Sequence, residues 1–388
     1  MRIAMFYHSL LSDWNHGNAH FLRGVVTELL ARGHEVEVFE PVDSWSFQNL
    51  IASHGDGCIS EFQQAYPHLS STRYDLANLN LEEVLDGVDL VLVHEWNDPG
   101  LVARIAEYRR RNGCRVLFHD THHRSISDSD RIFHRSIERF DGVLAFGQSI
   151  ATQYRRLGWG PRVWTWHEAA DTRVFHPLPR TSDYQGDLVW VGNWGDDERT
   201  RELQEFLLEP VRELALRASV FGVRYPDDVL ATLAAGGIEY RGWTPNYRVP
   251  SVFSRFKVTV HIPRRPYAAI LHGVPTIRVF EALACGIPLV SGPWADSEGL
   301  FTLGEDFLMA ANGAEMEKHL REILSDNDMA NEMAVRGRKT ILSRHTCAHR
   351  VEELLSICRE LGLEPGIKRH YSRPAVGVEV PAGTHGGA

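Results

Sequence analysis

The sequence has little of what marks a membrane, secreted or nucleic-acid-binding protein. No apolar run approaches the roughly 20 residues of a membrane-spanning helix, and the N-terminal stretch is too short for a signal sequence. The 388 residues include five cysteines without a CxxC pair or metal-ligand spacing, as is typical of a reduced cytosolic protein. The formal net charge of −10 gives no general basic character. We therefore expect a cytoplasmic protein with no transmembrane segment and no nucleic-acid partner.

The motifs of several enzyme classes are missing as well. No GxGxxG follows the first expected strand, so a dinucleotide cofactor is not indicated. No GxSxG elbow and no cysteine–histidine arrangement favours acyl transfer. The chain also contains no internal repeat.

What the chain does contain is a regular alternation of strands and helices. Its length predicts two domains, and 43% hydrophobic with 24% charged residues is ordinary for a globular protein. In the N-terminal part, apolar runs predict strands at 3–7, 36–39, 90–93, 114–118, 143–146 and 162–166. Helical spacing predicts helices at 19–32, 101–108, 132–140 and 150–157. This pattern indicates a doubly wound α/β domain.

A second alternation follows a linker. Residues 176–186 have no periodicity and read as the connection. Strands are expected at 188–191, 219–223, 238–241, 258–262 and 287–291, and helices at 200–216, 229–235, 276–285, 316–324, 329–343 and 346–361. The predicted domains are 1–177 and 178–361, with a final helix that is able to pack back on the first domain, and 362–388 is predicted to be a disordered tail. Two such domains leave a cleft where the carboxyl ends of both sheets face each other.

The stretch from Gly273 to Val290 is the most informative part of the second domain. Pro275 and Thr276 open a helix and Gly286 closes it. Arg278 and Glu281 lie three residues apart and so share one face of this helix. A helix N-terminus beside an arginine and a carboxylate suits a phosphorylated ligand rich in hydroxyl groups. The alternative is a surface ion pair.

Further candidates lie where other expected strands end. Gly17 and Asn18 follow the first strand, either as a ligand-contacting loop or as an ordinary turn. In the second domain, Gly192 frees the backbone and Arg199 is placed to bind a diphosphate with its guanidinium fork. Between them, the acidic pair at 196–197 suits a helix N-terminus better than a metal site.

Polar clusters in the first domain suggest catalytic groups. The run from His119 to His123 invites a metal-hydrolase interpretation, but no second cluster completes a metal site. A histidine that binds a substrate hydroxyl, with Asp120 orienting it, needs fewer partners. Glu95 is either a general base or a helix cap. In the second domain, Arg264 either neutralises phosphate or lies in a solvated pair, and Trp243 either packs on a nucleobase or fills a gap.

At these residues the chain resembles a known family, the GT-B glycosyltransferases of group 1 (the family-four type), and within it the branch named for the spore-maturation protein CgeB. The resemblance covers about residues 1–360. It rests on the stretch 16–38 with its Gly-His-Glu-Val turn, on 168–177, which is similar to the family's NGVDxxxFxP segment, and on 344–350. The most specific match is the helix of 275–286.

The resemblance implies two Rossmann-like domains facing across a cleft, with the acceptor on the N-terminal side and the donor on the C-terminal side. It implies a hexosyltransferase that uses a nucleotide-diphosphate sugar, of UDP or GDP type, with retention of configuration and without a metal or other cofactor. The family's ribose-binding glutamate falls on Glu281 and its phosphate-contacting backbone on Thr276 and Ile277. The remaining donor-side positions that the resemblance assigns are Gly17, Asn18, Asn193, Arg199, Gly242 and Trp243, and His119 falls near the donor sugar.

One departure separates this chain from the family. The first of the paired glutamates falls on position 273, which is Gly273. Its carboxylate is therefore missing or comes from elsewhere, with Glu95, His119, Asp120 and His272 as candidates. Only one of the two basic residues of the first turn is present, and Arg278 or Arg264 is a possible substitute for the other.

The sequence is also compatible with two other functions. A GT-B-like sugar-nucleotide epimerase shares the two-domain cleft, and a catalytically degenerate coat or assembly protein would explain Gly273. The segment 44–80 carries no motif that identifies an acceptor, which is left as a glycan, small molecule or protein. The oligomeric state is also left open.

Overall fold

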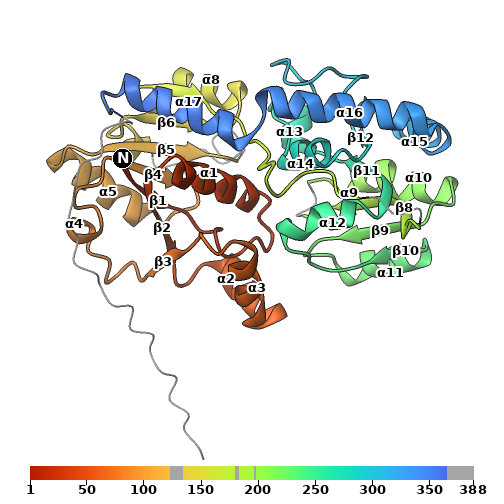
Figure 1. Cartoon of the computed structure of the whole chain (residues 1–388), viewed down its shortest axis with the longest axis horizontal. Coiled ribbons are helices and arrows are strands. Elements are labelled where there is room, and N and C mark those ends of the chain that lie inside the picture. Colours follow the sequence, from red (N-terminus) through yellow and green to blue (C-terminus); the bar gives the residue numbers. More distant parts are fainter. Residues whose placement is uncertain (123–133, 180–182, 196–197, 365–388) are drawn as a thin grey trace, which may run out of the picture.

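The computed structural model describes residues 1–122, 134–179, 183–195 and 198–364. Its two parallel sheets lie side by side, each covered by helices on both faces (Figure 1). This arrangement confirms the predicted α/β fold class. Most of the expected disordered tail and the acidic pair at 196–197 lie outside the described residues.

The first sheet has, within the described residues, seven parallel strands in the order β3-β2-β1-β4-β5-β6-β7. Their bounds are β1 (Arg2–Phe6), β2 (Glu35–Pro41), β3 (Ser71–Tyr74), β4 (Leu90–His94), β5 (Arg115–Asp120), β6 (Gly142–Ala145) and β7 (Val163–Thr165). The covering helices are α1 (Ala19–Ala31), α2 (Trp45–His54), α3 (Gly57–Ala65), α4 (Leu81–Val84), α5 (Pro99–Arg111), α7 (His134–Ile137) and α8 (Gln148–Leu157).

The second sheet, counted over the same described ranges, has six parallel strands in the order β10-β9-β8-β11-β12-β13. They are β8 (Gly186–Val191), β9 (Ala218–Phe221), β10 (Ile238–Tyr240), β11 (Phe256–His261), β12 (Leu289–Ser291) and β13 (Leu308–Met309). The helices are α9 (Thr200–Leu203), α10 (Glu209–Glu213), α11 (Asp227–Ala235), α12 (Val249–Phe253), α13 (Arg265–Ala269), α14 (Ile277–Cys285), α15 (Gly313–Ser325), α16 (Asn327–Arg344) and α17 (Cys347–Glu360). In both sheets the strand order reverses beside the first strand of the domain, and ligands of such folds bind at this point.

The structure differs from the sequence prediction in several places: α12, α13 and β13 were not predicted, and two longer segments differ as well. The helix expected over 200–216 is interrupted by a π-helical turn at Gln204–Leu208. This turn directly precedes Pro210, which has no N–H to donate and whose ring disfavours regular helix before it. The segment from 44 to 84 folds into α2, α3, β3 and α4, whose short apolar patterns gave no clear period.

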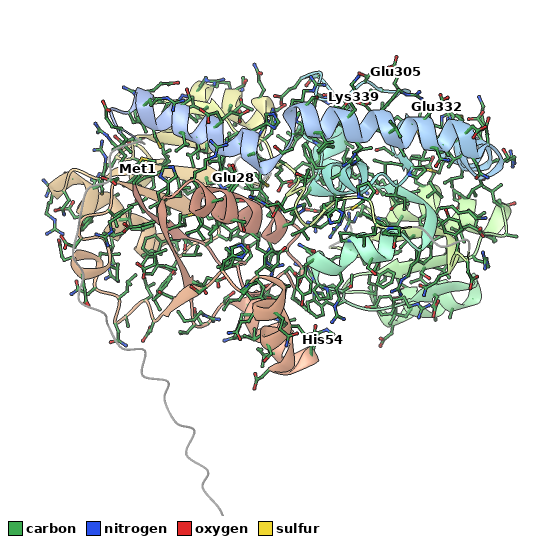
Figure 2. The ribbon with its side chains drawn as sticks, in the orientation of Figure 1. Met1, Glu28, His54, Glu305, Glu332 and Lys339 are labelled. Carbon is green, nitrogen blue, oxygen red and sulfur yellow. The ribbon has the colours of Figure 1, made fainter. Side chains whose placement is uncertain are left out.

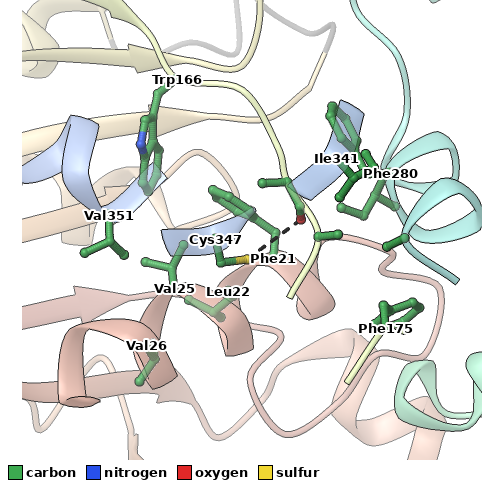
Figure 3. Close-up of a cluster of buried hydrophobic side chains, with 14 of the residues drawn as sticks. Phe21, Leu22, Val25, Val26, Trp166, Phe175, Phe280, Ile341, Cys347 and Val351 are labelled. Atoms are coloured by element: carbon green, nitrogen blue, oxygen red, sulfur yellow. Dashed lines mark hydrogen bonds between the residues drawn. The ribbon is translucent and has the colours of Figure 1, made fainter. Parts of the chain in front are cut away.

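The last helix, α17, leaves the second domain and packs along α1 of the first (Figure 1). Phe21, Leu22 and Val25 of α1 lie beside Cys347 and Val351 in one buried cluster (Figure 3). The Trp166 indole N–H also donates to the backbone oxygen of Arg350 at 2.8 Å. The chain thus connects the two domains twice, once by the linker and once by α17.

Polar contacts border this helix pair. Arg32 at the end of α1 pairs with Glu352 of α17 at 2.7 Å and with Glu28 at 2.8 Å. Figure 2 shows Glu28 on α1 close below α17. Because these pairs are partly exposed, each contributes little on its own, and the apolar contact supplies most of the stability. Among the helices that the structure describes, none has the length and apolarity to cross a membrane.

Gly24 sets how closely the two helices approach. A Cβ at this position would lie 2.5 Å from Cys347 Sγ and 2.7 Å from Asp171 Cβ. We therefore expect Gly24→Ala to lower the free energy of unfolding by about 1–3 kcal/mol, the usual cost of overpacking, as measured by urea denaturation. The control is Gly57→Ala at the start of α3, where no atom lies within 4 Å of the added Cβ. Equal stability of the two variants would contradict this account of the α1–α17 contact.

Candidate functional site

A cavity of about 430 Å³ lies between the two domains, at the carboxyl ends of both sheets. Its walls include the loop after β1, the residues after β5, the turn after β8, the end of β11 and the start of α14. Nine of the predicted donor-side residues line it: Gly17, Asn18, Gly192, Asn193, Arg199, Arg264, Thr276, Ile277 and Arg278. The structure therefore brings together positions that are more than 250 residues apart in the chain.

Helix α14 begins at the cavity wall, as the sequence pattern predicts. Thr276 is its N-cap residue, and Gly286 ends it in the left-handed conformation with φ of 64°. The Thr276 side chain does not cap its own helix, because its hydroxyl contacts His261 Nε2 at 3.1 Å. Burial and the nearby Arg199 lower the pKa of His261 to about 3, so this ring is neutral. The Thr276 hydroxyl thus accepts no hydrogen bond from the first N–H groups of α14, although the Thr276 backbone oxygen accepts one from Val279 at 3.1 Å.

Arg199 is a partly buried cation in the same wall. Its guanidinium donates to the backbone oxygens of Asn193, Trp194 and Ile262 and lies 5.2 Å from the ring centre of Trp190. Within the described residues it forms no salt bridge with a carboxylate. Burial, and next the nearby Arg264, lower its pKa to about 9. A negative ligand in the cavity would compensate this charge.

Two further arginines of the wall have carboxylate partners. Arg264 pairs with Glu198 at 3.2 Å, and Arg278 pairs with Glu281. Glu281 itself does not line the cavity: it is fully buried, and its second oxygen lies 2.9 Å from His20 Nδ1 on α1. The expected ribose ligand is therefore part of an interdomain contact here.

The loop after β1 meets α14 directly. A Cβ on Gly17 would lie 2.8 Å from Ile277 Cγ2, so only glycine fits without a shift. The neighbouring Asn18 donates to Thr121 Oγ1 at 2.7 Å, which ties the loop to the end of β5. Asn15 on the same loop accepts a hydrogen bond of 2.8 Å from Asn193 of the second domain.

The three predicted catalytic residues lie behind the cavity wall. His119 is buried, contacts the Tyr7 hydroxyl at 2.8 Å, and has its pKa lowered to about 3 by burial. Asp120 accepts from the Tyr154 hydroxyl at 2.8 Å, and Glu95 accepts from the Thr121 backbone at 3.1 Å. Their chain neighbours Trp96, Thr121 and His122 line the cavity in their place.

The expected base-contacting residues lie beside the main cavity. Trp243 lines a small adjoining cavity of about 30 Å³ and donates from its indole to Asp13 Oδ1 at 3.0 Å. Gly242 lines neither space, and its φ of 70° is the left-handed turn that leads into Trp243. No group of three or more His, Cys, Asp or Glu side chains in the described ranges is placed to hold a metal ion.

The structure explains why position 273 is occupied by glycine and not by a larger residue. Its φ is 85°, and a Cβ there would lie 2.6 Å from Ser297 Oγ and 2.9 Å from Glu298 Cγ. The space of the missing glutamate is thus filled by other side chains. Glu298 does not replace it in the cavity, because its oxygens bind His167 Nε2 at 2.9 Å and the Gln148 N–H at 2.7 Å.

One cavity residue, Glu168, was not selected from the sequence. It lies after β7 and is 3% exposed, yet it lines the cavity. Burial, and next the nearby Glu281, raise its pKa to about 8. Its position in the segment 168–177 could have indicated a functional role, because Glu168 stands where the family's NGVDxxxFxP segment has its asparagine.

Comparisons with known proteins agree with this geometry. Residues 199–356 match the family described as "Glycosyl transferase-like". No curated protein matches the sequence of this chain.

Solved structures share the fold over nearly the whole chain. Sucrose-phosphate synthase from Thermosynechococcus elongatus has a TM-score of 0.65 at 14% identity, covering 93% of this chain and 99% of that one. Anabaena HepE in complex with UDP and glucose has a TM-score of 0.66 at 13% identity, covering 92% and 99%. An alpha-glucosyltransferase in complex with UDP has a TM-score of 0.69 at 12% identity, covering 92% and 100%.

The family match covers less than half of the chain, and the structural likeness extends over both domains. Together they support the predicted glycosyltransferase. Residues 199–356 are accordingly similar to a glycosyl transferase-like family, and the chain has the GT-B fold.

Proposed function

We propose that the protein transfers a sugar from a nucleotide-diphosphate donor, of the UDP type, to a hydroxyl-bearing acceptor. The observation that carries this proposal is Arg199, a partly buried cation in the cavity wall without a salt-bridge partner in the described structure. The start of α14 lies in the same wall, and the positive end of a helix favours an anion. The Anabaena protein with UDP and glucose, and the alpha-glucosyltransferase with UDP, support a uridine nucleotide.

In this proposal the arginines stabilise the leaving group. The bond between the anomeric carbon and the diphosphate breaks, and the diphosphate departs with the electron pair. Arg199, Arg264 and Arg278 line the space into which this charge develops. Since the cavity already supplies three cations and a helix N-terminus, we propose that no metal ion is needed. For retention without a covalent glycosyl-enzyme, the acceptor oxygen attacks the anomeric carbon from the face that the diphosphate leaves, and its proton passes to a phosphate oxygen.

The ribose role implied for Glu281 requires the cleft to open. In the arrangement described, His20 and Arg278 occupy its two oxygens. Separation of α1 from α14 would free one oxygen for the two ribose hydroxyls. We therefore propose that donor entry and domain opening are coupled through the His20–Glu281 contact.

The acceptor is proposed to enter on the first-domain side. Trp96 lines the cavity, is 36% exposed, and lies edge to face with His122 at 5.6 Å between ring centres. Its exposed face suits a sugar or another ring bearing hydroxyl groups. The resemblance of 275–286 to the CgeB helix supports a place in that branch.

The role of Arg199 can be tested with inorganic pyrophosphate. We expect pyrophosphate to raise the melting temperature of the protein. We expect Arg199→Gln to weaken pyrophosphate binding by about 10- to 100-fold, because it removes hydrogen bonds between charged groups. Arg201→Gln is the control, since Arg201 is exposed and does not line this cavity. Equal loss in both variants would indicate a general charge effect and contradict the assignment.

The nucleotide is tested by calorimetry with UDP, GDP, TDP and ADP. We expect saturable binding of UDP, and slow hydrolysis of a matching UDP-sugar by water in the absence of acceptor. An epimerase would convert the donor into an isomer without acceptor, and a degenerate assembly protein would bind the nucleotide without turnover. Binding of none of the four nucleotides would count against any sugar-nucleotide function.

Metal independence and stereochemistry are tested on the same hydrolysis. We expect the rate to be unchanged by EDTA, because the three arginines replace a cation in the site. Proton NMR recorded early in the reaction should show a free sugar with the anomeric configuration of the donor. A loss of rate with EDTA that Mg²⁺ or Mn²⁺ restores would contradict the first expectation, and an inverted product the second.

A further inference from the structure

The side chain of Glu168 lies where α14 begins. Its carboxyl group lies near the backbone N–H of Ile277, the first residue of the helix, and this N–H favours the charged form. Its Oε1 is buried and has no hydrogen bond partner in the described structure. Glu168 also lines the cavity, although it is 3% exposed. A buried carboxyl oxygen without a partner is costly unless a ligand completes its hydrogen bonds.

The groups that face Glu168 determine its charge. Glu281 and Arg278 face it from α14, and the buried phenol of Tyr267 faces it from α13. Burial is the largest influence and Glu281 the next, and together they raise the pKa to about 8, against the smaller opposing effect of Arg278. Below pH 8 the carboxyl is therefore neutral and carries a proton that it can donate.

We propose that Glu168 binds the donor diphosphate as a carboxylic acid, donating a hydrogen bond from Oε1 to a phosphate oxygen. The inference rests on the proposed function. An ionised carboxylate at this place would repel the diphosphate, whereas a neutral one adds a donor to those of Arg199 and the helix N-terminus. Glu168 is then a donor-binding residue, and its proton makes binding of the nucleotide depend on pH.

The test is UDP binding by calorimetry between pH 7 and 9 for the wild type, Glu168→Gln and Glu168→Ala. Glutamine keeps a neutral hydrogen bond donor of the same shape. We therefore expect the dissociation constant of Glu168→Gln for UDP at pH 7 to lie within about threefold of the wild-type value, and Glu168→Ala to bind UDP about tenfold more weakly. Between pH 8 and 9 the wild type should lose affinity and take up a proton on binding. Glu168→Gln should show neither effect over this pH range.

Proton uptake is read from the binding heat in buffers of different ionisation enthalpy. The control is Glu40→Gln, which removes a carboxyl that is also buried with a raised pKa but lies outside the cavity. This variant should keep the wild-type pH dependence even where its melting temperature falls.

Three outcomes would overturn the inference. Tighter UDP binding in both Glu168 variants would show that the group is an anion that competes with the diphosphate. Lower melting temperatures with unchanged UDP affinity and pH profile would show a purely structural role. In both cases UDP still binds and the proposed function stands. No UDP binding by the wild type would remove the proposed function and this inference with it.

Discussion

The concentration of partly buried positive charge at the cleft is the constraint on which this site depends. Arg199 donates hydrogen bonds to backbone oxygens, and its pKa is lowered to about 9. The desolvation of its charge therefore destabilises the folded state. Arg264 and Arg278 share the wall but have carboxylate partners. The positive start of α14 adds to the same field. A diphosphate supplies the compensating charge, which is why the cavity suits a nucleotide-sugar donor better than a neutral ligand.

The same elements that form the cavity also join the domains. Asp13 on the loop after β1 accepts hydrogen bonds from the Trp243 indole at 3.0 Å and the Asn246 N–H at 2.9 Å. His20 reaches Glu281 at 2.9 Å, and its other nitrogen accepts from the Asp171 N–H at 2.8 Å. Apolar contacts join the domains there as well, such as that between the rings of Phe146 and Tyr267. We expect opening of the cleft to break these contacts and to leave the apolar packing of α17 on α1 as a fixed connection.

The fold could be predicted from the sequence because most buried strands are continuous apolar runs and most of the longer helices have a clear period. The donor side of the site followed from strand ends and from the family resemblance, and Arg199, Thr276 and Ile277 do line the cavity. Side-chain environments could not be read in this way. Glu168 became apparent only when burial and the α14 contact were known, and Glu281 proved to be enclosed by His20, 261 residues away in the chain. Short patterns in 44–84 hid α2 and α3 because neither carries a long apolar stripe.

The most direct measurement of the central claim is a crystal structure of the protein with UDP. The account predicts the diphosphate in the cavity, with a phosphate oxygen within hydrogen bond distance of the Arg199 guanidinium and of an N–H at the start of α14. UDP bound outside this cavity, or in it with the diphosphate turned away from Arg199, would contradict the account.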